Sequence, residues 1–286
     1  MPAIFDSYIK KYIEMKINKP LSFFLILFVV LAVFMFNITF AGKIPGSILI
    51  PVRIGLIVLF FTAWRLLRKK GKKHAEYLAF TLMLVNLAFL IIYYTIELWN
   101  INLESPMGIA LAKLNDSFFI CLILIISFLF NGYKLKDIHL TRGRLGTGLI
   151  IGFFSFFLMG FLTLSTSAQP VESTYLKRNM VWILLFVLSN GFMEELLFRG
   201  IFLKKLNNLF KPVWSIILTA IVFAASHMQV TYTPDVLVFV GICLILGLIW
   251  GYLMHYTKSI IASMLFHAGA DLMIIIPIYS SLGINV

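Results

Sequence analysis

The sequence predicts an all-α polytopic membrane protein, a bundle of about nine transmembrane helices with eight as the alternative count. Of its 286 residues, 61% are hydrophobic and only 13% are charged, whereas a soluble domain is about half apolar and a quarter charged. Apolar stretches recur along the whole chain, and each is close to the ~20 residues that a helix needs to cross ~30 Å of hydrocarbon. These two observations exclude an ordinary soluble fold.

Charged loops separate the apolar stretches and therefore set the expected spans. The first stretch is too long for a cleaved signal peptide, and no small-residue cleavage site follows it. Arg53 interrupts the second span, and Lys113 with Asp116 crowds the start of the fourth, so these two spans are the weakest. We place the spans at 20–40, 46–66, 77–99, 108–131, 146–165, 179–202, 212–230, 235–256 and 259–279.

The distribution of Lys and Arg predicts a cytoplasmic N-terminus, because cytoplasmic loops carry the positive excess. Alternate loops hold most of these residues, and the opposite set holds only Lys43, Lys177 and Arg178. The net charge of +12 therefore reflects topology, and no nucleic-acid module is visible. Cys121 and Cys243 both lie inside apolar runs and fit neither a disulfide framework nor a metal-ligand spacing.

Ionisable residues at membrane depth are costly, so each one is a functional hypothesis. The first half of the chain offers only the scattered polar residues Arg53, Asn86, Lys113 and Asp116, and Asp116 is open to a lid or a packing role. The last hundred residues instead carry three ordered clusters on three spans.

The first cluster contains two adjacent acids, Glu194 and Glu195, followed by Arg199. Residues four apart share a helix face, so Glu195 and Arg199 are expected to form an internal ion pair. Glu194 points about 100° away from Glu195 around the helix and has no obvious local partner. We therefore expect Glu195 to have a structural role. Glu194 is expected to take part in the chemistry, where an unpaired carboxylate suits a general base.

The second and third clusters each bring an imidazole into the membrane. His227 follows Phe223 by four residues across small side chains, and His267 and Asp271 are again four apart on one face. Counted from the expected cytoplasmic end of each helix at ~1.5 Å per residue, Glu194 and His267 lie at similar depths of roughly 12 Å, and His227 lies deeper at roughly 20 Å. A lone histidine in an apolar helix is usually a packing residue, but the ordered occurrence of three clusters favours one shared site.

These motifs resemble those of the CPBP family, which comprises CAAX prenyl endopeptidases and Abi-type or bacteriocin-processing membrane proteins. The resemblance rests on Glu194-Glu195-xxx-Arg199, Phe223-xxx-His227 and His267-xxx-Asp271, within residues 178–276. It implies a protease core over 146–286, while residues 1–145 form N-terminal helices of unassigned role. Asp271 stands where the family more often has Asn.

The resemblance implies an intramembrane endopeptidase with a catalytic cavity among its helices. By this analogy, Glu194 activates water, His227 helps to hold or deprotonate it, and His267 with Asp271 stabilises the oxyanion. Glu195 and Arg199 would keep the site assembled. The absence of a G-x-S-x-G sequence weighs against a serine protease.

The cofactor remains open at this point. If the enzyme depends on metal, Glu194, His227 and His267 would be the ligands and zinc the ion. The H-E-x-x-H arrangement of zinc proteases is absent, so glutamate-type catalysis without a bound ion is preferred.

The expected substrate is a membrane-associated peptide or a lipid-modified protein. The protein is expected in a cell membrane, in contact with its lipids, and no nucleic-acid partner is expected. The composition is typical of a bacterial protein. Two alternatives stay open. One is a non-proteolytic family scaffold or bacteriocin self-immunity protein with a membrane-protein partner, and the other is a proton-coupled transporter using the same acids and histidines.

Overall fold

The computed structural model describes residues 20–99, 101–166 and 173–283, and these residues form helices joined by turns without any strand. Within these described residues, eight helices are long and apolar enough to cross a membrane. The chain is therefore a multi-pass all-α membrane protein. The spanning segments are Pro20–Thr39, Gly46–Lys69, Lys73–Ile96, Pro106–Phe130, Leu145–Thr166, Ser173–Leu206, Val236–Thr257 and Ile261–Leu282.

A helix occupies each of the nine expected positions, but one of them is too short to span. Helix α8, Pro212–Ala225, has 14 residues, which extend ~21 Å against the ~30 Å of a hydrocarbon core. The span expected at 212–230 instead ends in turns from Ser226 onward. The two weakest predictions, interrupted by Arg53 and by Lys113 with Asp116, are confirmed as the long helices α2 (Gly46–Lys69) and α4 (Pro106–Phe130).

Local sequence signals set several helix boundaries. Helix α4 (Pro106–Phe130) begins where Ser105 accepts a hydrogen bond from the backbone of Gly108 at 3.1 Å, with proline in the first turn. Asp235 accepts from the Val238 backbone at 3.0 Å at the start of α9 (Val236–Thr257). That helix ends where Lys258 adopts a left-handed conformation with φ of 58°.

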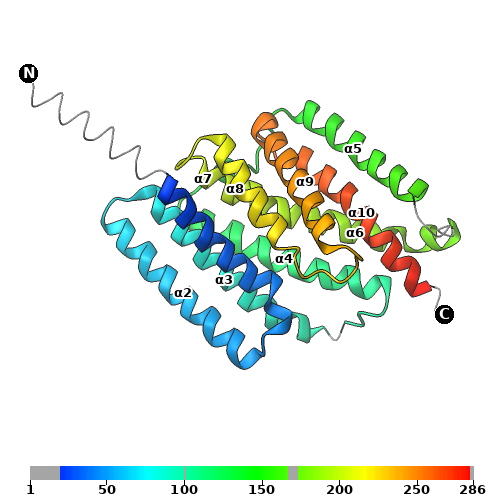
Figure 1. Ribbon diagram of the computed structural model, residues 1–286, viewed down its shortest axis with the longest axis horizontal. Coiled ribbons are helices and arrows are strands. Elements are labelled where there is room, and N and C mark those ends of the chain that lie inside the picture. The colour runs from blue at the N-terminus through cyan, green and yellow to red at the C-terminus, as the bar shows by residue number, and fades with distance from the viewer. Residues whose placement is uncertain (1–19, 100, 167–172, 284–286) are drawn as a thin grey trace, which may run out of the picture.

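Helix α6 (Ser173–Glu195) packs against α4 and against α10 (Ile261–Gly283), which in turn packs against α9. In Figure 1, α2 (Gly46–Lys69) lies at one edge, with α3 (Lys73–Leu98) and then α4 leading toward the centre, and α5 (Leu145–Thr166) lies at the opposite edge. Phenylalanines on α5, including Phe154 and Phe157, are exposed and suit a lipid-facing surface. One buried apolar cluster contains residues from both the N-terminal and the C-terminal helices.

Three irregular segments interrupt this regular packing. The first helix ends in a π-helix, η1 (Met35–Thr39), and α6 continues into a second π-helix, η4 (Leu196–Leu203), before the short α7 (Lys204–Leu206). The third segment is the set of turns that follows α8. Because non-helical backbone at membrane depth is tolerated where it lines a cavity, these segments indicate where a site lies.

The orientation of the chain stays a prediction. The N-terminal lysines that enter that argument, Lys10, Lys11, Lys16 and Lys19, lie outside the described residues. The remaining short elements are 3₁₀ turns, η2 (Ala41–Lys43) and η3 (Leu135–Ile138).

Candidate active site

The two adjacent acids end helix α6, and the π-helix η4 begins at the next residue. π-Helical turns inside α-helices are often found at functional sites, because the extra residue per turn redirects side chains. Glu195 is fully buried, whereas the Glu194 side chain retains 17% exposure. The predicted inequality of the two acids therefore has a structural basis.

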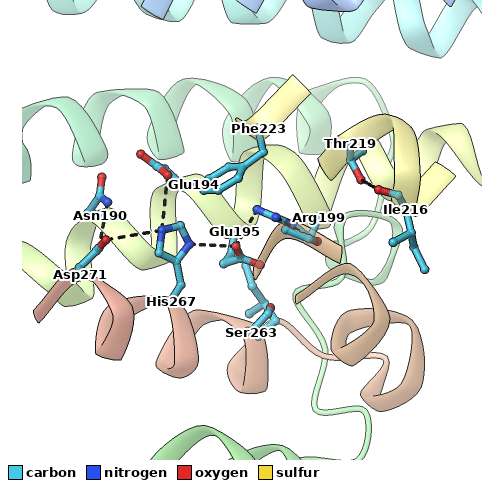
Figure 2. A network of polar contacts seen from close by, with 12 residues as sticks. Asn190, Glu194, Glu195, Arg199, Ile216, Thr219, Phe223, Ser263, His267 and Asp271 are labelled. Carbon is cyan, nitrogen blue, oxygen red and sulfur yellow. Dashed lines mark hydrogen bonds and ion pairs between the residues drawn. The ribbon is translucent and has the colours of Figure 1, made fainter. Parts of the chain in front are cut away.

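Glu195 is the centre of a buried polar chain (Figure 2). Its Oε1 atom accepts from Arg199 Nη1 at 2.8 Å and lies 2.9 Å from His267 Nδ1. The Arg199 guanidinium also donates through Nη2 to the backbone carbonyl of Gly247 at 3.3 Å. This chain connects α6 and η4 to α9 and α10, and it contains the ion pair expected from the spacing.

The second nitrogen of His267 faces two more acids. Nε2 lies 3.5 Å from Glu194 Oε2 and 3.7 Å from Asp271 Oδ1. Asp271 Oδ2 in turn accepts from Asn190 Nδ2 at 2.9 Å. Since a carboxylate only accepts, Nδ1 of His267 carries the hydrogen toward Glu195. His267 thus links all three acids of the site, as Figure 2 shows.

Aromatic rings enclose the buried cationic and imidazole groups. Trp250 on α9 stacks on His267, with ring centroids 4.1 Å apart and planes 10° from parallel. The Arg199 guanidinium lies 4.6 Å from the Phe223 ring centroid and 5.3 Å from that of Trp250. Cation–π contacts are stronger where water is excluded, so Phe223 and Trp250 help to hold Arg199 inside the membrane domain.

His227 lies just after the C-terminal end of α8. Its Nδ1 atom is 2.9 Å from the carbonyl oxygen of Phe223. A carbonyl can only accept, so Nδ1 carries the ring hydrogen and Nε2 of the neutral ring is left as an acceptor. The Phe223-xxx-His227 spacing is therefore a hydrogen-bonding unit that selects one tautomer.

Three of the predicted site residues line one cavity of about 400 Å³. They are Glu194, His227 and Asp271, and Asn190 lies on the same wall. Ile38 and Thr39 from η1 also contribute, as do Ser226, Gln229, Val230 and Tyr232 from the turns after α8. His267, Glu195 and Arg199 are buried behind this wall, at 2%, 0% and 0% exposure.

Two polar atoms of this wall accept no hydrogen bond among the described residues, although one of them, Glu194 Oε2, lies 3.5 Å from His267 Nε2. Both atoms, Asn190 Oδ1 and Glu194 Oε2, are buried. Buried polar atoms are usually bonded to protein or to ordered water. The cavity is therefore suited to hold a polar guest, such as a water molecule or the polar backbone of a peptide.

The three candidate zinc ligands do not form a metal site in this arrangement. Within the described residues, no three His, Cys, Asp or Glu side chains are grouped to hold a metal ion. Nδ1 of His267 is hydrogen-bonded to Glu195, and its Nε2 faces Glu194 and Asp271.

Sequence reasoning did not assign a role to Asn190 or Trp250. Asn190 precedes Glu194 by four residues, so the same helical spacing that paired Glu195 with Arg199 could have found it. No comparable signal exists for Trp250, because its stacking on His267 joins two helices and depends on how α9 packs against α10.

Comparison with known families agrees with the motifs. Residues 176–273 match the family model described as Type II CAAX prenyl endopeptidase Rce1-like. No curated protein and no solved structure matches the chain. The matched region contains every predicted site residue, and it confirms the family resemblance that the motifs indicated. At the level of the family, the match supports a CAAX-type endopeptidase embedded in the membrane.

Proposed function

We propose that this chain, whose residues 176–273 match the family model of Rce1-like type II CAAX prenyl endopeptidases, hydrolyses a peptide bond of a membrane-associated or lipid-modified peptide, with Glu194 as the general base. One observation carries the proposal. The Glu194 carboxylate and the acceptor-presenting ring of His227 line the same cavity, and the carboxylate has a buried oxygen without a hydrogen-bond partner.

The reaction would begin with water held between Glu194 and His227. Glu194 accepts one proton from the water while the oxygen attacks the carbonyl carbon of the scissile bond. His227 Nε2 accepts the second hydrogen of the same water as a hydrogen bond and so directs the attack. The tetrahedral intermediate then collapses, and the proton held by Glu194 passes to the departing amine. Water is consumed, and a carboxylic acid and an amine are formed.

Asn190 is the best placed group for the oxyanion. One hydrogen of its Nδ2 is donated to Asp271, and the other remains available toward the cavity that both residues line. Preorganised amide donors of this type stabilise developing negative charge. We propose that Asp271 acts by orienting Asn190, and that His267 acts from behind the wall by holding Glu194 and Asp271.

Glu195 and Arg199 would support the site without contacting substrate. Their ion pair is fully buried, and Glu195 fixes the tautomer of His267 through Nδ1. Such supporting contacts hold catalytic groups in their productive geometry. The apolar part of the cavity lining, including Phe186 and Ile274, suits hydrophobic substrate side chains.

The proposal is tested with purified protein in detergent and a peptide pool that includes farnesylated CAAX peptides, with cleavage read by mass spectrometry. Wild type and Glu194→Gln are compared, each with and without a zinc chelator. Cleavage by wild type that is lost in Glu194→Gln and unaffected by the chelator supports glutamate-type hydrolysis. Folded wild type that cleaves no peptide would contradict the proposal and favour the scaffold alternative.

A further inference from the structure

A second cavity of about 420 Å³ adjoins the first. The two share Ile38, Lys113, Glu194 and Phe198 in their linings, so Glu194 lies where they meet. Much of the second lining comes from the first helix, α2, α3 and α4, which lie outside the family match at 176–273. Its volume is within the ~300–1,000 Å³ range of ligand sites.

Arg53 of α2 lies in this lining and is only 3% exposed. Its Nε donates to Asn37 Oδ1 at 3.0 Å, Nη1 donates to the Phe89 carbonyl at 2.8 Å, and Nη2 donates to the Asn37 carbonyl at 3.4 Å. Asn37 is held in turn by Asn86 Oδ1 at 2.9 Å. The guanidinium is thus fixed in orientation by two neighbouring segments, η1 and α3.

The charge of Arg53 is not neutralised by an acid. No carboxylate lies within ion-pair distance of it among the residues that the structure describes. Three of its five N–H groups are used, which leaves two donors. An unpaired cation among spanning helices is costly, so a ligand that brings negative charge would be stabilised there.

The other charges facing this cavity are Lys113, Asp116 and Glu194. Asp116 is one helical turn from Lys113 on α4 and accepts from Asn115 Nδ2 at 3.3 Å. Glu194 already faces His267. Among the described residues, Lys113 also has no carboxylate within ion-pair distance, but its ammonium lies 5.6 Å from the Phe186 ring centroid, whereas the Arg53 guanidinium is fixed by hydrogen bonds.

We propose that the second cavity is a subsite for a carboxylate of the bound peptide, with the Arg53 guanidinium as its anchor. This inference rests on the proposed function, because the cavity reaches the scissile bond only if Glu194 acts there. A planar carboxylate fits the fork of a guanidinium with two free N–H groups. A carboxylate anchored there would fix which peptide bond lies beside Glu194, so Arg53 would set the distance from the anchor to the cleavage point.

Binding of peptide pairs tests the subsite independently of cleavage. The tightest-binding peptide of the pool is labelled with a fluorophore and prepared with a free C-terminal carboxylate and with a carboxamide. Hydrogen bonds to charged groups are worth ~1.5–3 kcal/mol, so wild type should bind the acid about 10- to 100-fold more tightly. Arg53→Gln should bring this ratio to about one, whereas Arg65→Gln, an exposed arginine on the same helix, should leave it unchanged.

Each other outcome has a defined meaning. Equal affinity of wild type for acid and amide overturns the inference, even if the peptide is cleaved. A parallel loss of both affinities in Arg53→Gln would mean a purely structural role and also overturns it. If Arg53→Gln does not fold, Arg53→Lys replaces it, because lysine keeps the positive charge but lacks the paired N–H donors of the guanidinium. This variant should retain only part of the preference for the acid peptide over the amide.

Lipid is the remaining source of an anion. The binding measurements are repeated in nanodiscs with and without phosphatidylglycerol, and the preference for the acid should be the same in both. Loss of this preference when the anionic lipid is present would assign Arg53 to a lipid phosphate and overturn the peptide subsite. A wild-type preference for the acid in protein that cleaves nothing would instead retain the subsite and contradict the proposed hydrolysis.

Discussion

The Glu195–Arg199 pair is buried without any exposed atom, so removing one partner leaves the other charge inside the membrane domain. Removing one member of a buried pair typically costs ~3–5 kcal/mol. We therefore expect Arg199→Leu to lower the free energy of unfolding by about that amount. The matched control is Arg68→Leu, which breaks a longer pair of 3.8 Å between the exposed Arg68 and the partly buried Glu76 and should cost less than ~1 kcal/mol. Unfolding in detergent measures both, and equal small losses would contradict the expectation.

Asp271 is expected to tolerate asparagine. Its Oδ2 accepts from Asn190 and its Oδ1 faces His267 Nε2. An asparagine can keep the first contact with its oxygen and offer an amide hydrogen to an unprotonated Nε2 in place of the second. Asp271→Asn should therefore stay within about tenfold of wild-type kcat/KM, whereas Asp271→Leu should lose ~100-fold or more, the scale of one oxyanion donor. Similar rates for the two variants would argue against the orienting role.

The residues that the sequence could predict are those with a partner on the same helix. Glu195 with Arg199 and His267 with Asp271 follow from spacing alone, and both pairs are close in the structure. Contacts between helices do not follow from spacing. For this reason the link from His267 to Glu195 and the anchoring of Arg53 by Asn37 were not foreseen.

At the scale of elements, Gly191 sets how closely α6 approaches α10. A Cβ atom at this position would lie 3.0 Å from the carbonyl oxygen of Met264 and 3.1 Å from the backbone nitrogen of Ala268. Such crowding against backbone typically costs ~1–3 kcal/mol, and it would move the acids away from His267. We expect Gly191→Ala to lower the cleavage rate at least about tenfold. Gly55→Ala, where nothing lies within 4 Å, is the control and should cleave as wild type does.

The turn after η3 predicts a pH dependence of stability. His139 is buried, and burial together with Lys204 and Lys258 lowers the pKa of its imidazole from 6.5 to about 4. The unfolded chain therefore binds this proton more readily than the folded one. The contribution of His139 to stability is present above about pH 6.5 and is lost as the pH falls toward 4.

The loss expected from His139 is up to about 3 kcal/mol, from 1.36 kcal/mol per pKa unit. His139→Asn keeps a residue that tolerates the left-handed backbone found there, φ 56°, and it removes the titration. Unfolding of both proteins at pH 7 and at about pH 4.5 measures the difference. Identical acid losses in wild type and variant would show that His139 does not titrate as expected.

The positions of the long helices could be predicted, because each one needs only a run of apolar residues. The irregular segments could not. The π-helices at Met35–Thr39 and Leu196–Leu203 lie inside long apolar segments, so their irregular hydrogen bonding depends on tertiary packing. The same holds for the end of α8 at Ala225, short of the expected end at residue 230. These segments contribute to the walls of the two cavities beside Glu194.

At the scale of the whole molecule, the N-terminal helices complete the site. Ile38, Arg53 and Lys113 line cavities together with Glu194, and Lys205 after η4 is enclosed by Tyr77, Phe128 and Tyr133 at 4.8, 5.2 and 4.5 Å. Although the family motifs lie within 176–273, the site is therefore not confined to that region.

A fragment comprising residues 145–286 is consequently expected to be inactive, even though it holds every motif residue. Without the N-terminal helices, the apolar side chains of the C-terminal helices that pack against them in the shared cluster are exposed. The cavities also lose the wall that contains Lys113 and Arg53. Co-expression of residues 1–144 should restore cleavage in part. A fragment that cleaves the peptide alone as fast as the full chain would contradict this dependence.

Pre-steady-state cleavage of the best substrate tests most directly whether Glu194 activates a water molecule for direct attack on a peptide bond. Wild type mixed with excess peptide should release the amine product linearly, without an initial burst, and Glu194→Gln should be slower by ~10²–10⁴-fold, the usual contribution of a general base. A burst of amine equal to the enzyme concentration would indicate a covalent acyl-enzyme. Either that burst or a Glu194→Gln variant as fast as wild type would contradict the account.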